Sequence, residues 1–261
     1  MPHVILGLLL AHIISDFYFQ TDESCKKKKE WKCREWFIHC GCVFAFSFIA
    51  IFAPNHWLGA LVTALIVMAI HLLIDVIKVA YENQRQLRHQ CEKRDSIWPF
   101  VIDQVFHLMV IFATAVILFK VLQDYHCWME IIDTSILFTI LVFLAVAKPA
   151  NTFIRICLKS AKIQLGDESA NEKTFHSGRI IGTGERFLIL LFVILTQYEA
   201  IGFLVAAKSI LRFSSAQESE KSEYVLAGTL LSIAVALVLG LIVVKRTTIG
   251  DFFNTLLPVI S

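Results

Sequence analysis

The sequence has little charge. Charged residues make up 18% of its 261 positions, against about 25% in an ordinary soluble domain. Hydrophobic residues make up 57%, and the mean hydropathy is +0.67. This composition excludes a disordered chain, a nucleic-acid-binding module and a secreted disulfide scaffold. It favours a protein that is integrated into a membrane.

Three familiar sequence features are also missing. The seven cysteines are odd in number and mostly lie in or beside apolar segments, so we expect reduced thiols rather than a disulfide framework. The apolar stretch 4–10 lacks the basic region and cleavage site of a signal peptide, and we expect it to belong to the mature protein. The glycines within 178–186 do not form a phosphate-binding loop.

Long apolar stretches dominate the remainder of the chain. A helix needs about 20 mostly apolar residues to cross the hydrocarbon core of a bilayer. The sequence therefore predicts an all-α, polytopic membrane helix bundle with about seven transmembrane helices. The first stretch is interrupted by His12 and Asp16, and the fifth ends early at Lys148-Pro149, so either could be tilted or partly re-entrant. The seven stretches are 2–20, 36–53, 58–80, 98–122, 134–150, 186–207 and 223–244.

The basic residues predict the orientation of this bundle. Twenty of the 24 Lys and Arg residues fall on one side if the spans alternate, mainly in segments 23–35, 78–97 and 148–186. The positive-inside rule then predicts an outer N-terminus and a cytoplasmic C-terminus. The basic segments 23–35 and 78–97 are expected to contact anionic lipid, with docking of a soluble protein as the alternative. No nucleic-acid partner is expected, and the oligomeric state is left open.

Polar residues divide the predicted bundle into two parts. Residues 1–122 form four predicted helices that carry histidines and aspartates. Residues 123–261 add three further helices and a cytoplasmic segment, 151–184, whose start is amphipathic and basic, as in a helix lying on a membrane surface. We expect both parts to belong to one integrated membrane domain.

The polar residues of the first part are spaced as ligand pairs. Three apolar helices each carry a His and an Asp four positions apart, which places both on one helix face, and a fourth helix adds one histidine. The predicted topology brings all of them to a similar depth near the cytoplasmic leaflet. Ionisable groups inside a membrane are costly and usually face the bundle interior. The predicted ligands are His12, Asp16, His39, His71, Asp75, Asp103 and His107.

Three interpretations fit this set. Imidazole and carboxylate groups together suit Zn, Mn or Fe, and seven ligands exceed the three or four of one catalytic zinc, so two metals are allowed. The residues could instead form hydrogen bonds that hold the helices together. They could also line an ion or proton path of a channel, transporter or other membrane effector.

Metal binding is the leading interpretation. It predicts a divalent-metal-binding membrane protein, with a metal-dependent hydrolase of lipid-like or amphipathic phosphoesters as one activity, although the sequence leaves open whether the protein is an enzyme. Lys78 is expected to extend to the membrane interface. Candidate residues behind the ligands are Gln20, Asp22, Gln104, Glu185 and Arg186, with capping or interfacial roles as the alternative for the first two.

The same motifs resemble a known family. The segments HIISDFYFQ (12–20), HLLIDVIK (71–78) and DQVFH (103–107) are similar to signatures of a bacterial integral membrane family catalogued as domain of unknown function three-three-zero-seven. The resemblance covers roughly residues 4–240 and includes the later stretches 184–186, 207–213 and 223–230. It implies a multi-pass protein of the bacterial inner membrane, and it implies no established activity. A looser likeness to bacterial inner-membrane metal-dependent hydrolases rests on composition.

Overall fold

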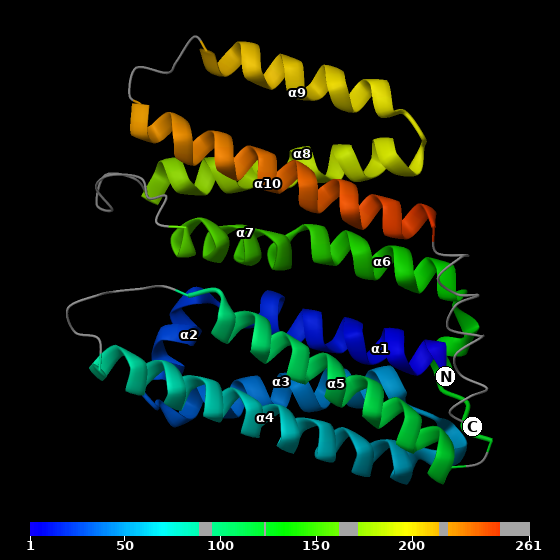
Figure 1. Ribbon diagram of the computed structural model, residues 1–261. Coiled ribbons are helices and arrows are strands. Elements are labelled where there is room, and N and C mark those ends of the chain that lie inside the picture. Colours follow the sequence, from blue (N-terminus) through cyan, green and yellow to red (C-terminus); the bar gives the residue numbers. More distant parts are fainter. Residues whose placement is uncertain (89–95, 123, 162–171, 214–218, 246–261) are drawn as a thin grey trace. The chain divides into compact units, whose positions relative to one another are not determined.

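The structure, a computed structural model, describes residues 1–88, 96–122, 124–161, 172–213 and 219–245. Every regular element within these ranges is a helix (Figure 1), which confirms the predicted all-α class. The chain divides into two compact units, residues 1–141 and 142–261, which are described separately below.

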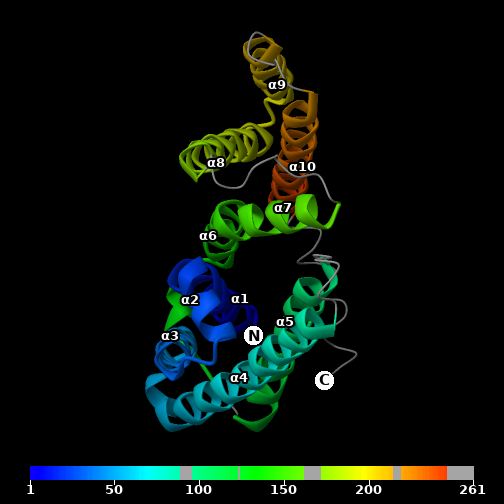
Figure 2. The ribbon, with the colours of Figure 1, turned by 90° about the vertical axis from the view of Figure 1, so that its left-hand side faces the viewer.

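Four long helices build the first unit. The helix α1 (Pro2–Ile13) continues directly into the π-helical turn η1 (Ile14–Phe19). This helix packs against α3 (Cys33–Ile51) and α5 (Trp98–Val121), and α4 (Trp57–Arg88) packs against the same two helices (Figures 1 and 2). The four helices therefore surround a common interior.

A short helix, α2 (Asp22–Lys29), covers one part of this bundle and contacts α3 and α4. The Thr21 hydroxyl caps it by accepting a hydrogen bond from the backbone N–H of Ser24 at 3.1 Å. Acidic residues occupy its first turn and four lysines its last, as the helix dipole favours. Charge and capping thus form a helix from a segment with few apolar residues.

Six helical segments of the described chain are long and apolar enough to cross a membrane. Large apolar side chains remain exposed on them, including Phe37 at 78% and Val121 at 70%. Exposed apolar surface of this extent is typical of helices that face lipid. The six segments are Pro2–Phe19, Cys33–Ile51, Pro54–Arg85, Trp98–Val121, Thr134–Ser160 and Leu226–Val244.

The predicted sixth span, 186–207, is two helices in the structure. Helix α8 (Glu172–Ile194) ends before Thr196, whose φ of 58° is left-handed. The N–H groups of Thr196 and Gln197 bond back to carbonyls of the last helical turn at 3.1 and 2.8 Å, an arrangement that terminates helices. Helix α9 (Tyr198–Phe213) then begins. Thr196 and Gln197 thus end a helix within the stretch 186–207, which hydrophobicity alone predicts to be continuous.

The predicted fifth span is longer than its apolar stretch. Helix α6 (Thr134–Val146) is followed after Ala147 by α7 (Lys148–Ser160), so the chain continues past Lys148-Pro149. Pro149 lies in the first turn of α7, where its missing N–H costs no helical hydrogen bond. Residues 151–160 belong to this helix, whereas the predicted cytoplasmic residues 162–171 lie outside the described chain.

Helix α10 (Ser219–Val244) organises the second unit by packing against α7 and α8. Gly240 permits a close approach to α8, because a Cβ atom there would lie 2.8 Å from Val193 Cβ. Two short 3-10 turns, η2 (Pro54–His56) and η3 (Trp128–Ile131), complete the elements of the described chain.

Candidate functional site

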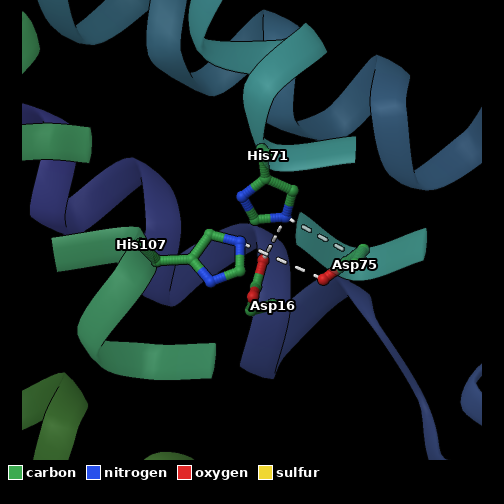
Figure 3. A group of neighbouring side chains, drawn as sticks. All are labelled: Asp16, His71, Asp75 and His107. Carbon is green, nitrogen blue, oxygen red and sulfur yellow. Dashed lines mark ion pairs between the residues drawn. The ribbon is translucent and has the colours of Figure 1, made fainter. Parts of the chain in front are cut away.

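Four side chains from three helical segments, three of them buried and Asp16 half-buried, converge inside the first unit (Figure 3). Asp16 comes from η1, His71 and Asp75 from α4, and His107 from α5. One ligand atom of each lies within 4.8 Å of the others. The spacing of four residues in α4 places His71 and Asp75 one turn apart on the same face. Such a group of nitrogen and oxygen atoms could hold a divalent metal ion.

His39 of α3 adds a further imidazole to this group. Its Nε2 atom lies 3.0 Å from His71 Nε2, 3.2 Å from Asp75 Oδ2 and 3.7 Å from Asp16 Oδ1. His71 Nε2 in turn lies 3.3 Å from Asp16 Oδ1. All four helices of the bundle therefore contribute to the cluster. His39 is 4% exposed, so water competes little for these atoms.

His12 reaches the cluster from the end of α1. Its Nδ1 atom lies 3.7 Å from Asp16 Oδ2, and its ring stacks on that of His107 with centroids 4.9 Å apart. The helix widens from α to π directly after this region, between Ile14 and Phe19. π-Helical turns occur frequently at functional sites. Here the π-helical turn contains Asp16, a member of the cluster.

Several buried polar atoms of the cluster have no hydrogen-bond partner. They are His12 Nδ1, Asp16 Oδ1, Asp103 Oδ1 and His107 Nε2. His107 Nδ1 lies 2.8 Å from the Asp103 carbonyl oxygen, which fixes the proton on Nδ1 and leaves a lone pair on Nε2. Histidines that bind metals are held by such outer hydrogen bonds.

A hydrogen bond also fixes which ring nitrogen of His12 carries the proton. Its Nε2 atom lies 3.3 Å from the Gln104 amide oxygen, an acceptor, so Nε2 donates and Nδ1 carries the lone pair. That lone pair faces Asp16 Oδ2, another acceptor. Two acceptors that face each other in a buried site repel, unless a cation lies between them. The role of Gln104 behind a metal ligand stays a prediction.

Two lysines, which were not among the predicted site residues, form ion pairs with aspartates of the cluster. Lys28 Nζ donates to Asp75 Oδ2 at 2.7 Å and is 2% exposed, although it belongs to a basic run interpreted as an orientation signal. Lys78 Nζ donates to Asp103 Oδ2 at 2.7 Å, and the Lys78 side chain is 28% exposed. Its extension to the membrane interface stays a prediction. The position of Lys78 three residues after Asp75, on the same helix face, is a signal that could have revealed this pairing.

Asp103 differs from the other two aspartates. Its Oδ2 atom accepts hydrogen bonds from Lys78 and, at 3.0 Å, from Gln104 Nε2. Its Oδ1 atom lies 3.6 Å from His107 Nδ1, the nitrogen that is already engaged by the Asp103 carbonyl. Asp103 thus sits beside the group of Figure 3 and orients His107. Its role as a direct metal ligand stays a prediction.

The predicted outer residues near α2 have other neighbours. Gln20 Nε2 donates to Cys25 Sγ at 3.1 Å. Burial raises the pKa of the Cys25 thiol, despite the opposing effect of that hydrogen bond, so this cysteine stays protonated at neutral pH and is a poor metal ligand. Asp22 is the first residue of α2, where an acidic side chain suits the helix dipole.

The predicted outer residues Glu185 and Arg186 lie in the second unit. Glu185 pairs with Lys208. Arg186, 2% exposed, donates to the Val146 carbonyl at 2.9 Å, to Ser232 Oγ at 2.9 Å and to Asn151 Oδ1 at 2.5 Å. A fourth bond reaches Thr183 Oγ1 at 3.0 Å. Their predicted role behind the metal ligands stays a prediction.

Comparison with known proteins gives one match. A family profile described as protein of unknown function (DUF3307) matches residues 4–146, which is more than half of the chain. The matched region contains every residue of the His/Asp cluster. No curated protein and no solved structure matches the chain.

Proposed function

We propose a function for this chain, which belongs to the DUF3307 family of proteins of unknown function, from its buried His/Asp cluster. The chain is a divalent-metal-binding membrane protein, and its activity is metal-dependent hydrolysis. The observation that carries this proposal is the convergence of ligand atoms from Asp16, His71, Asp75 and His107 within 4.8 Å. Zn, Mn and Fe are the ions that suit such donors.

The unpartnered atoms favour metal binding over a purely structural role. A cluster that only joined helices would pair its donors with its acceptors, since each unpaired buried polar group costs about 1–3 kcal/mol. Here His12 Nδ1, Asp16 Oδ1 and His107 Nε2 lack partners. Bound divalent metal would give these atoms a partner.

The lysines support an anionic substrate such as a phosphoester. A divalent ion in such a site polarises a phosphoryl oxygen and lowers the pKa of a water molecule. In hydrolysis the water oxygen bonds to phosphorus, the bond from phosphorus to the leaving oxygen breaks, and one water proton passes through a carboxylate to that oxygen. Lys28, 2.7 Å from Asp75, places a fixed positive charge at the edge of the ligand group, where it can attract the substrate.

Apolar helices that face lipid suit a substrate that is itself dissolved in the bilayer. We place the cluster near the cytoplasmic leaflet of a bacterial inner membrane, with the N-terminus outside, because the Lys and Arg distribution favours this orientation. Lys26 is exposed on α2, where it is available to anionic lipid headgroups.

The proposal is tested with purified, tag-free protein in detergent. Bound Zn, Mn and Fe are measured by elemental analysis, and the release of phosphate from soluble and lipid phosphomonoesters is followed with each metal. We expect activity that His71→Ala abolishes and that His126→Ala retains, since His126 is an exposed histidine remote in sequence from the cluster. Metal binding without hydrolysis of any phosphoester would contradict the enzymatic half of the proposal.

An ion or proton path is the competing function. A small cavity of about 20 Å³ adjoins the imidazoles of His12, His71 and His107, and its remaining walls are apolar except for Ser47. A cavity of this size holds about one water molecule, which favours a closed site over a hydrated route. Proton or cation flux into liposomes that is lost in His71→Ala would instead support the path.

A further inference from the structure

The two carboxylates at the centre of the cluster each face two ways. Asp16 directs Oδ1 toward His39 and His71, at 3.7 and 3.3 Å, and Oδ2 toward His12 at 3.7 Å. Asp75 directs Oδ2 toward His39 and His71, at 3.2 and 3.9 Å. Asp16 thus lies between two sets of imidazoles, His39 with His71 on one side and His12 on the other.

The second oxygen of Asp75 faces the other imidazole group. Asp75 Oδ1 lies 4.0 Å from His107 Nε2. His107 and His12 stack on each other, and both carry unpartnered nitrogen atoms that face carboxylate oxygens. By the carboxylate oxygen that each imidazole faces, the cluster divides into two ligand groups, His39 with His71 and His12 with His107, joined by the same two aspartates. The rings of His71 and His107, with centroids 4.2 Å apart, lie where the two groups meet.

We infer that the cluster holds two divalent ions, one in each histidine pair, with Asp16 and Asp75 bridging them. The inference rests on the proposed function and deepens it by giving the number of ions and the ligands of each. Paired metal ions about 3.5–4 Å apart are typical of enzymes that hydrolyse phosphoesters.

The distances fit the first ion directly. Donor atoms that lie about 2.0–2.2 Å from one tetrahedral ion are about 3.3–3.6 Å apart. Five of the six separations among the ligand atoms of His39, His71, Asp16 and Asp75 run from 3.0 to 3.9 Å. These four atoms already outline a coordination shell.

The second group is wider. His12 Nδ1 lies 3.7 Å from Asp16 Oδ2, and His107 Nε2 lies 4.0 Å from Asp75 Oδ1. An ion would draw these atoms inward by a few tenths of an ångström, and the outer hydrogen bonds of both histidines leave the correct nitrogen free to bind. The second ion should therefore bind more weakly than the first.

Charge identifies the class of substrate. The three aspartates and the two paired lysines leave one net negative charge in the cluster. Two divalent ions turn this into a strong positive charge, which a buried site retains only with an anionic ligand. Inorganic phosphate, the group shared by phosphoester substrates and their product, should therefore strengthen binding of the second ion.

The experiment counts ions in the tag-free protein. Elemental analysis after loading with Mn²⁺ should give two ions per chain, and the electron paramagnetic resonance spectrum should show an exchange-coupled pair. His107→Ala and His39→Ala should each retain one uncoupled ion, whereas Asp124→Asn, an exposed control, should retain two. Phosphate should lower the concentration of Mn²⁺ at which the coupled spectrum appears.

The wild-type spectrum decides the matter even where a variant fails to fold. One ion per chain at saturation, or two ions without exchange coupling, would overturn the inference of a bridged pair and leave the proposed metal binding intact. No bound ion would overturn both. A His107→Ala protein that still showed a coupled pair would contradict the assignment of ligands.

Discussion

The two units each bury a polar group, and the two groups differ in how completely they are satisfied. Arg186 in the second unit directs its guanidinium donors at four neutral oxygens at 2.5–3.0 Å. The His/Asp cluster of the first unit leaves His12 Nδ1, Asp16 Oδ1 and His107 Nε2 without partners. Arg186 donates a hydrogen bond to each of its four acceptors. The cluster, in contrast, has more acceptor atoms than hydrogen-bond donors.

This difference separates a structural role from a binding role. Arg186 joins α7, α8 and α10. Its Nε–H donates to the carbonyl oxygen of Val146, which the break between α6 and α7 frees from helical hydrogen bonding. Every atom is paired, so nothing further needs to bind. The cluster, in contrast, retains unpartnered atoms that a cation could pair. Buried polar residues in apolar helices therefore indicate a binding site where several acceptor atoms face one another and no hydrogen-bond donor lies between them.

The largest expected effect tests the cluster directly. Replacing Asp75 with Asn removes the charge that both imidazole groups share, and we expect metal affinity to fall by more than about 100-fold, since losing even an outer residue costs about 10–100-fold. Isothermal titration with Zn²⁺ measures the change, and Asp124→Asn is the control. Affinity within threefold of the wild type would show that Asp75 is not a ligand.

The second largest effect is expected at Arg186, the buried polar residue of the second unit. Arg186→Leu removes four hydrogen bonds, each worth about 0.6 kcal/mol inside a membrane, so the free energy of unfolding should fall by about 2 kcal/mol. Metal affinity should not change. Denaturation in detergent measures the first quantity and titration the second, with Lys208→Met as a control for a partly exposed ion pair. A loss of metal binding would give Arg186 a role at the cluster.

A smaller effect is expected from the residue behind His12. Gln104→Leu removes the acceptor that fixes the proton on His12 Nε2, and metal affinity should fall by about 10-fold. Titration of the Gln20→Leu protein provides the comparison, because Gln20 bonds to Cys25 instead. If both variants bind equally well, the outer hydrogen bond of His12 has no effect on the site.

The smallest effect has the opposite sign. Lys28 competes with a metal for Asp75 Oδ2, so Lys28→Met should raise metal affinity by about fivefold, the equivalent of about 1 kcal/mol. The same variant should bind phosphate more weakly when metal is present. Lys26→Met, which alters an exposed lysine of the same helix, should change neither quantity. Weaker metal binding in Lys28→Met would mean that the ion pair holds Asp75 in place.

Hydrophobicity predicts most of the helices because about 20 apolar residues have one stable solution in a bilayer. The apolar stretches 36–53 and 98–122 match α3 and α5 within a few residues. The stretch 186–207 fails, since the hydrogen bonds of Thr196 and Gln197 end α8 and hydropathy does not register a capping motif. Helix ends depend on local backbone bonding that an average over 20 residues hides.

The His/Asp cluster is likewise predictable from the sequence only in part. The spacing of four residues predicts that His71 and Asp75 share a face, and the structure places them so. Which lysine of the run 26–29 turns inward depends on how α2 packs across α3 and α4, a tertiary contact with no local signal. The partition of the ligands into two groups likewise depends on which carboxylate oxygen faces which helix.

Elemental analysis of the purified, tag-free protein shows whether the His/Asp cluster holds a divalent metal. We expect a stoichiometric divalent metal in the wild type and in Asp124→Asn, and its loss in the double variant Asp16→Asn/Asp75→Asn, which should still elute as a folded protein. If the wild-type protein stays free of Zn, Mn and Fe after loading, the cluster is not a metal site.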